Sequence, residues 1–558
     1  MKKFHKSILK VLILLTFLVA FPQYASGYET FKIPEQINIG IRYGESATPM
    51  VSLYAQGGLE LGYYMGNEFY SVMSFLENEE ILIRKDGFFM NWNETFIAYD
   101  FDREKDIHNT AVQGPIHIQI GETFNSREDA YTFITSLPKL DEEPYLVYED
   151  GWKVWIGLYR DIFNAQEAKN TISTLAADLP LNIIEGNDKR IQVLSKSGNV
   201  LFMYNVNDED HHFRAIPQKD SIGLIQVDGK KFRGNIIIDR YADSDLTIIN
   251  QLDFEEYLYG VVPREMSGEW PIEAQKAQAV AARNFAVEKL RSHQQYGFDL
   301  CAGTHCQVYG GYSSEHPRSK TAVDETRGKL LTYNGKIVTA FYHSNSGGHT
   351  EDVENIWSSP VGYLKGVEDP YSIGAPNDSW TKKYTKQEIE DILVSKGLSV
   401  GMLENILVTE YSTNDRVLKL EFRGTDGKKV LEKEKVRSIF GYNNIKSTWF
   451  QIITDSGISA VNVLFDLGQP PKQMSITNKF IVTAEGMEEL DEMDRPYIFN
   501  GKDYKEIGAY TEADSYLFSG KGWGHGVGMS QWGAKKMAEE GFTYDQILTY
   551  YYTGARVE

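Results

Sequence analysis

The alternation of hydrophobic and polar residues predicts strands throughout the first part of the chain. Residues 28–112 consist of short alternating runs, such as Ile37-Asn38-Ile39-Gly40-Ile41, which glycine and asparagine separate. A period of two is typical of strands with one buried face, joined by hairpin turns. We therefore predict a β-rich domain over residues 28–112. We find no residue pattern there that indicates a chemical role.

Residues 113–186 contain an internal duplication. Each half has a strand pattern followed by a helix pattern, and in residues 126–137 the apolar positions recur at three- and four-residue spacing. A hairpin joins the halves, and residues 182–184 form a closing strand. The predicted order is βαββαβ, which is typical of a ferredoxin-like layer of one sheet and two helices.

The two halves resemble those of a SPOR domain. The segments that carry the resemblance are "IG" followed by "SREDA", and "IGLY" followed by "NAQEA". Domains of this family bind peptidoglycan glycan strands that have lost their stem peptides. The resemblance implies that Tyr148, Trp152 or Trp155 lies on the surface and stacks on sugar rings. The alternative is a generic βαββαβ domain.

From residue 187 to residue 558 we predict a β-rich α+β domain with one long helix. The helix begins at Pro271, and Ala277, Ala281 and Phe285 follow one another at four-residue spacing. Small alanines allow close packing, so we expect this helix to be buried. The strands that the pattern predicts are at 191–194, 223–227, 231–238, 246–250 and 258–262. The fold class is therefore α+β and multidomain.

Composition and charge reduce the number of functions that the protein can have. The 558 residues carry a formal net charge of −21, which argues against nucleic acid as a partner because phosphates would be repelled. Residues 1–27 have four lysines, then an apolar run and small residues, as in a secretory signal peptide. The alternative is an uncleaved membrane anchor. Both interpretations predict an extracytoplasmic protein, secreted or associated with the cell wall.

Glu265 is the candidate acid. It follows the predicted strand 258–262 and precedes the long helix, with Met266 and Trp270 close by. A carboxylate near a helix N-terminus is usually a cap or a dipole partner, and the dipole lowers its pKa. An apolar wall instead raises the pKa towards that of a proton donor. The residues leave both roles open.

Arg283 lies within the alanine-rich helix, away from the alanine stripe. A guanidinium in a buried helix must reach solvent or bind a carboxylate or a polar substrate.

The chain has two cysteines, Cys301 and Cys306, with His293 and His305 close by in the sequence. Two thiolates and two imidazoles can complete a tetrahedral zinc site. Two nearby cysteines outside the cytoplasm can instead form a disulfide, and composition alone favours the disulfide.

Two glycine-containing motifs complete the candidate chemistry: "FYHSNSGG" at 341–348 and "GKGWGHGVGMSQWGA" at 520–534. Repeated glycine allows the backbone to approach a ligand closely, although a tight structural corner explains it equally well. The candidate substrate-binding residues in these motifs are Tyr342, His343, Ser344, Ser346, Trp523, His525 and Gln531.

Together these segments resemble the stage II sporulation protein D/LytB amidase-enhancer family over roughly residues 187–558. The strings that carry the resemblance are "YLYGVVPREMSGEWPIEAQKAQAVAARNFA", "CAGTHCQVYGGY", "FYHSNSGG" and "GWGHGVGMSQWGA". The resemblance implies a lytic transglycosylase that cleaves the MurNAc–GlcNAc bond of peptide-free glycan strands and leaves a 1,6-anhydro end. It also implies a catalytic Glu265, a functionally important Arg283 and structural zinc on His293, Cys301, His305 and Cys306. This favours zinc over the disulfide.

The proposed chemistry needs one carboxylate. Glu265 would protonate the glycosidic oxygen, and its conjugate base would then accept the proton of the C6 hydroxyl as that oxygen attacks C1. The chemistry itself requires no cofactor. The alternative function is a non-catalytic enhancer that binds glycan and stimulates a cell-wall amidase. A zinc hydrolase is disfavoured, because four protein ligands leave no open position for water.

Overall fold

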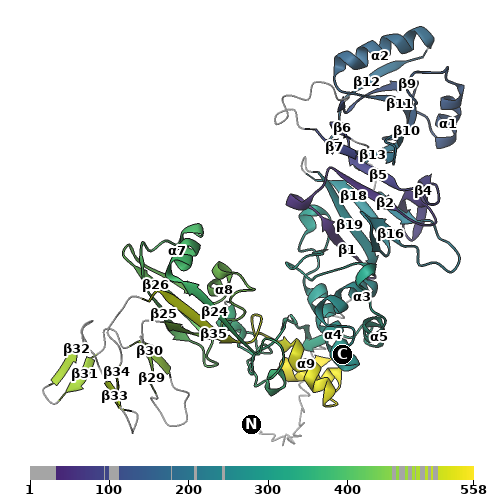
Figure 1. Cartoon of the computed structure of the whole chain (residues 1–558). Helices are drawn as coiled ribbons and strands as arrows, with labels where there is room; N and C mark the ends of the chain where they lie inside the picture. Colours follow the sequence, from purple (N-terminus) through teal and green to yellow (C-terminus); the bar gives the residue numbers. More distant parts are fainter. Residues whose placement is uncertain are drawn as a thin grey trace, which may run out of the picture. The chain divides into compact units, whose positions relative to one another are not determined.

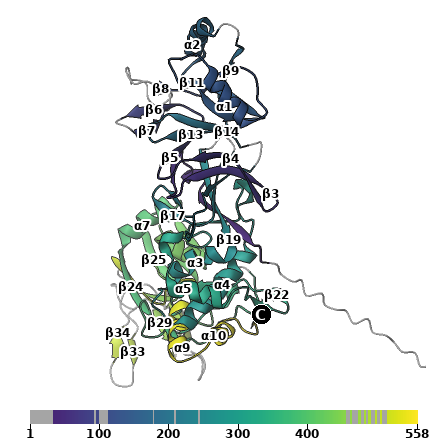
Figure 2. The ribbon, with the colours of Figure 1, turned by 90° about the vertical axis from the view of Figure 1, so that its right-hand side faces the viewer.

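The computed structural model describes residues 33–92, 95–99, 112–176, 179–206, 210–241, 245–357, 359–454 and 513–558, and short strands between 460 and 506 (Figures 1 and 2). The predicted signal or anchor of residues 1–27 lies outside them. The chain is mixed α+β and rich in strands, as predicted. Among the described helices, none is both long and apolar enough to cross a membrane.

The N-terminal strands share a sheet with strands that come after residue 200. This seven-stranded sheet has the order β20 (Leu300–Cys301), β1 (Gln36–Arg42), β19 (Leu246–Asp253), β18 (Asn235–Arg240), β15 (His212–Ala215), β3 (Leu59–Met65) and β4 (Glu68–Phe75). Strands β1 and β3 of the predicted domain 28–112 therefore pair with strands from later in the chain. By contrast, β6 (Phe89–Trp92), β7 (Thr95–Ala98) and β8 (Val112–Gln113) form a small three-stranded sheet by themselves. The domain boundary at residue 112 stays a prediction.

A second sheet of ten strands contains the duplicated region. Its order is β12 (Leu181–Ile184), β9 (Ile116–Ile120), β11 (Trp152–Tyr159), β10 (Tyr145–Tyr148), β14 (Val200–Asn205), β13 (Arg190–Ser195), β5 (Ile81–Lys85), β2 (Met50–Tyr54), β16 (Ile225–Val227) and β17 (Lys230–Phe232). Helices α1 (Arg127–Ser136) and α2 (Ile162–Leu175) lie between β9 and β10 and between β11 and β12 in the chain. Because β14 pairs with β10, the sheet continues beyond residues 113–186. The SPOR assignment stays a prediction.

The expected sugar-stacking tryptophans are buried. Trp155 is 1% exposed, stacks on His117 at 5.3 Å and lies beneath the Arg190 guanidinium. Trp152 packs against Phe202 of the added strand β14. Of the three aromatic residues expected at the surface, Tyr148 is partly exposed and the two tryptophans are buried. Neither tryptophan faces solvent, because β13 and β14 extend the sheet and supply side chains that cover them.

The region that carries Glu265 is helical where a strand was predicted. Helix α3 (Phe254–Glu265) begins at Asp253, whose side chain accepts hydrogen bonds from the N–H groups of Glu255 and Glu256. Residues 254, 255 and 257–262 are all buried, so tertiary packing surrounds this helix on every side. The predicted strand 258–262 was wrong, because valine and tyrosine have high strand propensity but the N-cap and the tertiary packing favour a helix.

The long helix is α4 (Ile272–Glu288), and Pro271 is its N-cap. It is buried along most of its length, as its alanines predicted. The helices that pack against it are α3, α5 (Pro317–Glu325), α9 (Gln531–Glu539) and α10 (Tyr544–Tyr551). Figure 1 shows α3, α4 and α5 together, below the strand β1.

Residues 379–454 build a unit with a separate hydrophobic core, and the chain returns from it through β35. Its elements are β24 (Ser379–Thr385), α7 (Lys386–Ser395), β25 (Leu403–Tyr411), β26 (Val417–Gly424), β27 (Gly427–Glu432), α8 (Lys435–Phe440), β28 (Phe450–Thr454) and β35 (Ser515–Lys521). This unit lies in the sequence between the two glycine-containing motifs.

The remaining elements are short. They are β6 (Phe89–Trp92), β7 (Thr95–Ala98), β8 (Val112–Gln113), β21 (Leu331–Tyr333), β22 (Lys336–Ile337), β23 (Tyr342–His343), α6 (Val353–Ile356), β36 (Met529–Ser530), β37 (Arg556–Val557) and the hairpin strands β29 (Ala460–Val463), β30 (Lys472–Ser475), β31 (Phe480–Thr483), β32 (Gly486–Glu489), β33 (Tyr497–Phe499) and β34 (Tyr504–Glu506).

Candidate functional site

Glu265 is the last residue of α3, so it lies at the negative end of a helix dipole and not at the positive end that the sequence suggested. Burial raises the pKa of Glu265 above its usual value. Hydrogen bonds from Gln531 and Tyr342, the positive charge of Arg264 and the N–H of Val308 act in the opposite direction, and burial outweighs them. The residue as a whole is only half-buried, so a ligand can reach it.

The Glu265 carboxylate belongs to a chain of polar side chains from five segments. Gln531 Nε2 lies 3.4 Å from Glu265 Oε2 and 3.3 Å from Gln278 Oε1. On the other side, Gln307 Nε2 donates to the Tyr342 hydroxyl over 3.1 Å. Tyr342 and Gln531 were predicted substrate-binding residues, and the structure brings both to Glu265. Gln278 and Gln307 were missed, because a buried glutamine has no signature in a sequence pattern.

The two glycine-containing motifs lie side by side. Strands β23 and β36 pair in parallel, and Asn345 and Trp523 exchange backbone hydrogen bonds of 3.0 and 2.8 Å. Gly526 has a φ of +85°, and a Cβ there would lie 2.5 Å from the Arg416 guanidinium. The glycine repeat is thus a tight structural corner that also carries Gln531 to the site.

Two predicted substrate contacts are interior residues. Ser346 is fully buried and donates to Asp369 Oδ2 over 2.6 Å. His343 is 4% exposed, and its Nδ1 lies 3.2 Å from the Val527 carbonyl oxygen. The structure therefore gives them a structural role instead of contact with substrate. Asp369, which also accepts a hydrogen bond from Tyr551, was missed because it lies outside both motifs.

The other candidates of these motifs are partly exposed. The Ser344 carbonyl accepts the N–H of Trp532 over 3.0 Å, which fixes the start of α9. His525 packs between Trp357 and His343, and Trp523 lies beneath the Lys446 ammonium.

Arg283 is completely buried and donates hydrogen bonds to both carboxylate oxygens of Glu255. The distances are 2.9 Å from Nε to Oε1 and 2.7 Å from Nη2 to Oε2. Its Nη1 donates to the Lys329 carbonyl over 3.1 Å. The sequence left solvent, a carboxylate or a polar substrate as possible partners of Arg283, and the structure shows that the partner is the Glu255 carboxylate. Arg283 thus joins α4 to α3, the helix that ends at Glu265, and acts as a positioning residue.

His293, Cys301, His305 and Cys306 form a cluster in which all four ligand atoms lie within 4.8 Å of one another. The cysteines are free thiols, and three ligand-atom pairs lie 3.3, 3.6 and 3.9 Å apart. A tetrahedral zinc ion with bonds of about 2.0–2.3 Å requires ligand atoms about 3.3–3.8 Å apart. These four residues therefore fit zinc.

The N-terminal strand contributes to this cluster. Cys301 lies on β20, which pairs with β1, and the Tyr43 side chain forms a hydrogen bond with Cys301. The Tyr43 ring also contacts His293, with a centroid separation of 5.4 Å. The alternating pattern of residues 28–112 gave no signal for this role, because only strand pairing brings Tyr43 to the cysteine loop.

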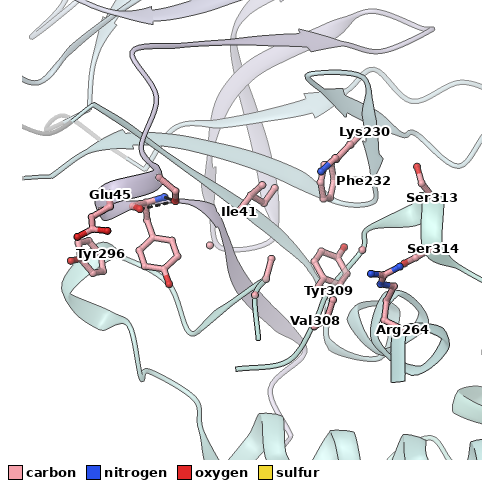
Figure 3. Close-up of a pocket in the computed structure, with 17 residues that line it drawn as sticks. Ile41, Glu45, Lys230, Phe232, Arg264, Tyr296, Val308, Tyr309, Ser313 and Ser314 are labelled. Atoms are coloured by element: carbon pink, nitrogen blue, oxygen red, sulfur yellow. Dashed lines mark hydrogen bonds between the residues drawn. The ribbon is translucent and has the colours of Figure 1, made fainter. Parts of the chain in front are cut away.

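A groove of about 1000 Å³ lies next to both regions (Figure 3). Ala302 and Gly303 of the cysteine loop line it, as do Arg264, which precedes Glu265, and Val308, whose N–H binds Glu265. One end is formed by Arg264, next to Glu265, together with Ser313 and Ser314. The other end is formed by Glu45 and Tyr296. Its lining residues are Gly40, Ile41, Tyr43, Gly44, Glu45, Ser46, Lys230, Phe232, Arg264, Tyr296, Ala302, Gly303, Val308, Tyr309, Gly310, Ser313 and Ser314.

Comparison with known proteins agrees with the resemblance seen in the sequence. Residues 242–333 match the stage II sporulation protein family, and residues 376–465 match a domain family of unknown function. The chain is 32% identical over 367 residues to the amidase enhancer of Bacillus subtilis, a match that covers 63% of this chain and 48% of that protein. It is 28% identical over 327 residues to stage II sporulation protein D of the same organism, covering 55% of this chain and 75% of that protein. The chain thus spans about half the length of the amidase enhancer.

We predict about one zinc ion per chain. Cys306→Ser removes a ligand, so we expect loss of the metal and a lower melting temperature, because a closed site stabilises the fold around it. Elemental analysis and thermal unfolding measure both. Denatured, chelator-treated protein should contain two titratable thiols. No metal and no free thiol would instead establish a disulfide.

We predict that Arg283→Met destabilises the protein by about 3–5 kcal/mol, because it leaves the Glu255 carboxylate buried without its partner. The double variant with Glu255→Gln should recover a large part of this loss. Denaturant unfolding measures both values. If Arg283 acts on substrate instead, the single variant will keep its stability and lose activity, and the double variant will not recover it.

Proposed function

We propose that this chain, a member of the stage II sporulation protein D/LytB family, is an extracytoplasmic lytic transglycosylase of the bacterial cell wall. Family membership supports a role in cell-wall remodelling and sporulation. The proposed substrate is the peptidoglycan glycan strand without stem peptides, cleaved between MurNAc and GlcNAc. The observation that carries the proposal is the raised pKa of a half-buried Glu265 beside a groove.

The first step is proton donation. A carboxyl group with a raised pKa remains protonated at a higher pH and can therefore act as a general acid. Glu265 would give its proton to the glycosidic oxygen as the C1–O bond breaks, and positive charge would develop at C1. Tyr342 and Gln531 donate to this carboxyl group and hold its orientation.

The second step returns the proton. The C6 hydroxyl oxygen attacks C1 of the same sugar, and the Glu265 carboxylate accepts the hydroxyl proton. A 1,6-anhydro ring forms and no water enters. The hydrogen-bond partners found for Glu265 among the described residues are an amide, a phenol and a backbone N–H. This setting suits a reaction with one carboxylate better than hydrolysis, which needs two.

Zinc on the four-residue cluster would have a structural role. Four protein ligands leave no coordination position for substrate, so the ion supplies stability and no reaction step. Cys306 is two residues from Val308, whose N–H binds Glu265. The cluster would thereby keep this loop in place at the groove.

An enhancer is the second candidate function, since a relative 32% identical to this chain has the name amidase enhancer. In that case the groove binds glycan without cleaving it, and an amidase is the partner. We also propose that residues 113–186 contribute to glycan binding in the manner of a SPOR domain, through surfaces other than the two buried tryptophans.

We predict that Glu265→Gln abolishes the formation of anhydro sugars from peptide-free strands, a loss of at least about 10²-fold. Glutamine keeps the shape of the side chain but cannot transfer the proton. Mass spectrometry of the products measures the outcome. The matched control is Glu404→Gln, which changes an exposed glutamate of β25 and should leave cleavage unchanged.

Two results would contradict the proposal. Full activity of a destabilised Glu265→Gln protein would show that the carboxylate is structural. Strand binding by the unaltered chain without any anhydro product would favour the enhancer.

We predict that kcat/KM falls as the pH rises through the raised pKa of Glu265, because only the protonated form is an acid. Gln531 stabilises the charged form of this carboxyl group. Gln531→Leu should therefore raise the pKa further and move the falling limb to higher pH. Gln387→Leu, on the exposed face of α7, serves as the control. A falling limb that stays in place would exclude Glu265 as the titrating group.

A further inference from the structure

The groove contains two cations without carboxylate partners. Arg264 and Lys230 both line it, and in the part of the chain that the structure describes neither has a carboxylate oxygen within 4.0 Å. By contrast, Arg233 on the same side of the fold is paired with Glu256 and Glu315. Because the chain has a net charge of −21, unpaired cations in a groove point to an anionic ligand.

Arg264 is close to the proposed reaction centre. It directly precedes Glu265, and its positive charge acts on the Glu265 carboxyl group. When Glu265 is protonated to act as an acid, it offers Arg264 no negative charge. The guanidinium is then available to a ligand in the reactive state.

The groove also has the properties of a sugar site. The partly exposed rings of Tyr43 and Tyr296 line it, and aromatic faces stack on sugar rings. Phe232 and Tyr309 also line it, but both belong to the buried core. Figure 3 shows Arg264 with Ser313 and Ser314 at one end, and Glu45 with Tyr296 at the other. Opposite charges at the two ends favour one orientation of a ligand with a negative group at the arginine end.

A glycan strand without stem peptides has such a group. Each MurNAc carries a lactyl ether, whose carboxyl group is an amide when the stem peptide is attached and a free carboxylate when the peptide is absent. Arginine binds carboxylates through two parallel hydrogen bonds, and an amide cannot replace the charge.

We infer that Arg264, assisted by Lys230, binds the free lactyl carboxylate and so distinguishes peptide-free from peptide-bearing strands. The inference rests on the proposed function and adds the residues that recognise the substrate. It makes residues 40–46, 230–232 and 296–310 one binding surface, although they are far apart in the sequence.

Binding by the full chain with Glu265→Gln tests the inference, since this variant should hold strands without cleaving them. The two probes are peptide-free glycan strands with free carboxyl groups and the same strands after amidation with methylamine. We expect the free-acid strands to bind about tenfold more tightly, and the difference to shrink at high salt.

The variant Arg264→Gln, added to Glu265→Gln, should weaken binding of free-acid strands by about tenfold and leave binding of amidated strands unchanged. Arg556→Gln is the matched control, because it removes the same charge from an exposed position on β37. It should preserve the preference for free-acid strands.

Equal binding of both probes by the protein with Arg264 intact would overturn the inference. An equal loss of affinity for both probes in Arg264→Gln would also overturn the inference, since the arginine would then act through the fold or through Glu265. The proposed function is judged separately, by whether the unaltered chain forms anhydro products from the free-acid strands.

Discussion

The buried ion pair between Glu255 and Arg283 is the interaction on which the site depends. It joins α3 to α4, and Glu255 also accepts the N–H of Gly328, which fixes the segment that follows α5. Two charges removed from water this completely are stable only because each is bonded to the other and to backbone groups. With α3 held in this way, its last residue, Glu265, has a defined position at the groove.

Three segments from later in the chain contact the end of α3 and form the environment of Glu265. Strand β23 brings Tyr342, the N-terminus of α9 brings Gln531, and the cysteine loop brings Val308. Each donates a hydrogen bond to the carboxyl group, yet burial outweighs them and raises its pKa. The contacts therefore orient the acid without holding it permanently in its charged form.

Several segments that contact one another at the site are far apart in the chain. The unit of residues 379–454 is inserted between the two glycine-containing motifs, but Arg416 of this unit donates to the Ser346 carbonyl and packs on Gly526. It thus contacts both motifs. Residues 36–42 similarly pair with β19 and β20, and this brings Tyr43 to the cysteine and histidine cluster.

The sequence alone determined the elements whose signals are local. The buried helix α4 was predicted from its alanines and the cysteine and histidine cluster from residue types and spacing. The order of the motifs indicated the similarity to the stage II sporulation protein family that residues 242–333 match. The features that depend on contacts between distant residues became visible only in the tertiary structure. Valine and tyrosine in α3 have strand propensity, and an N-cap and packing made them helical. Arg190 of β13 covers Trp155, and Asp369 binds the buried Ser346, although both partners lie outside the local patterns of the residues that they contact. The groove has no sequence signature, since strand pairing creates it from segments that are more than 180 residues apart.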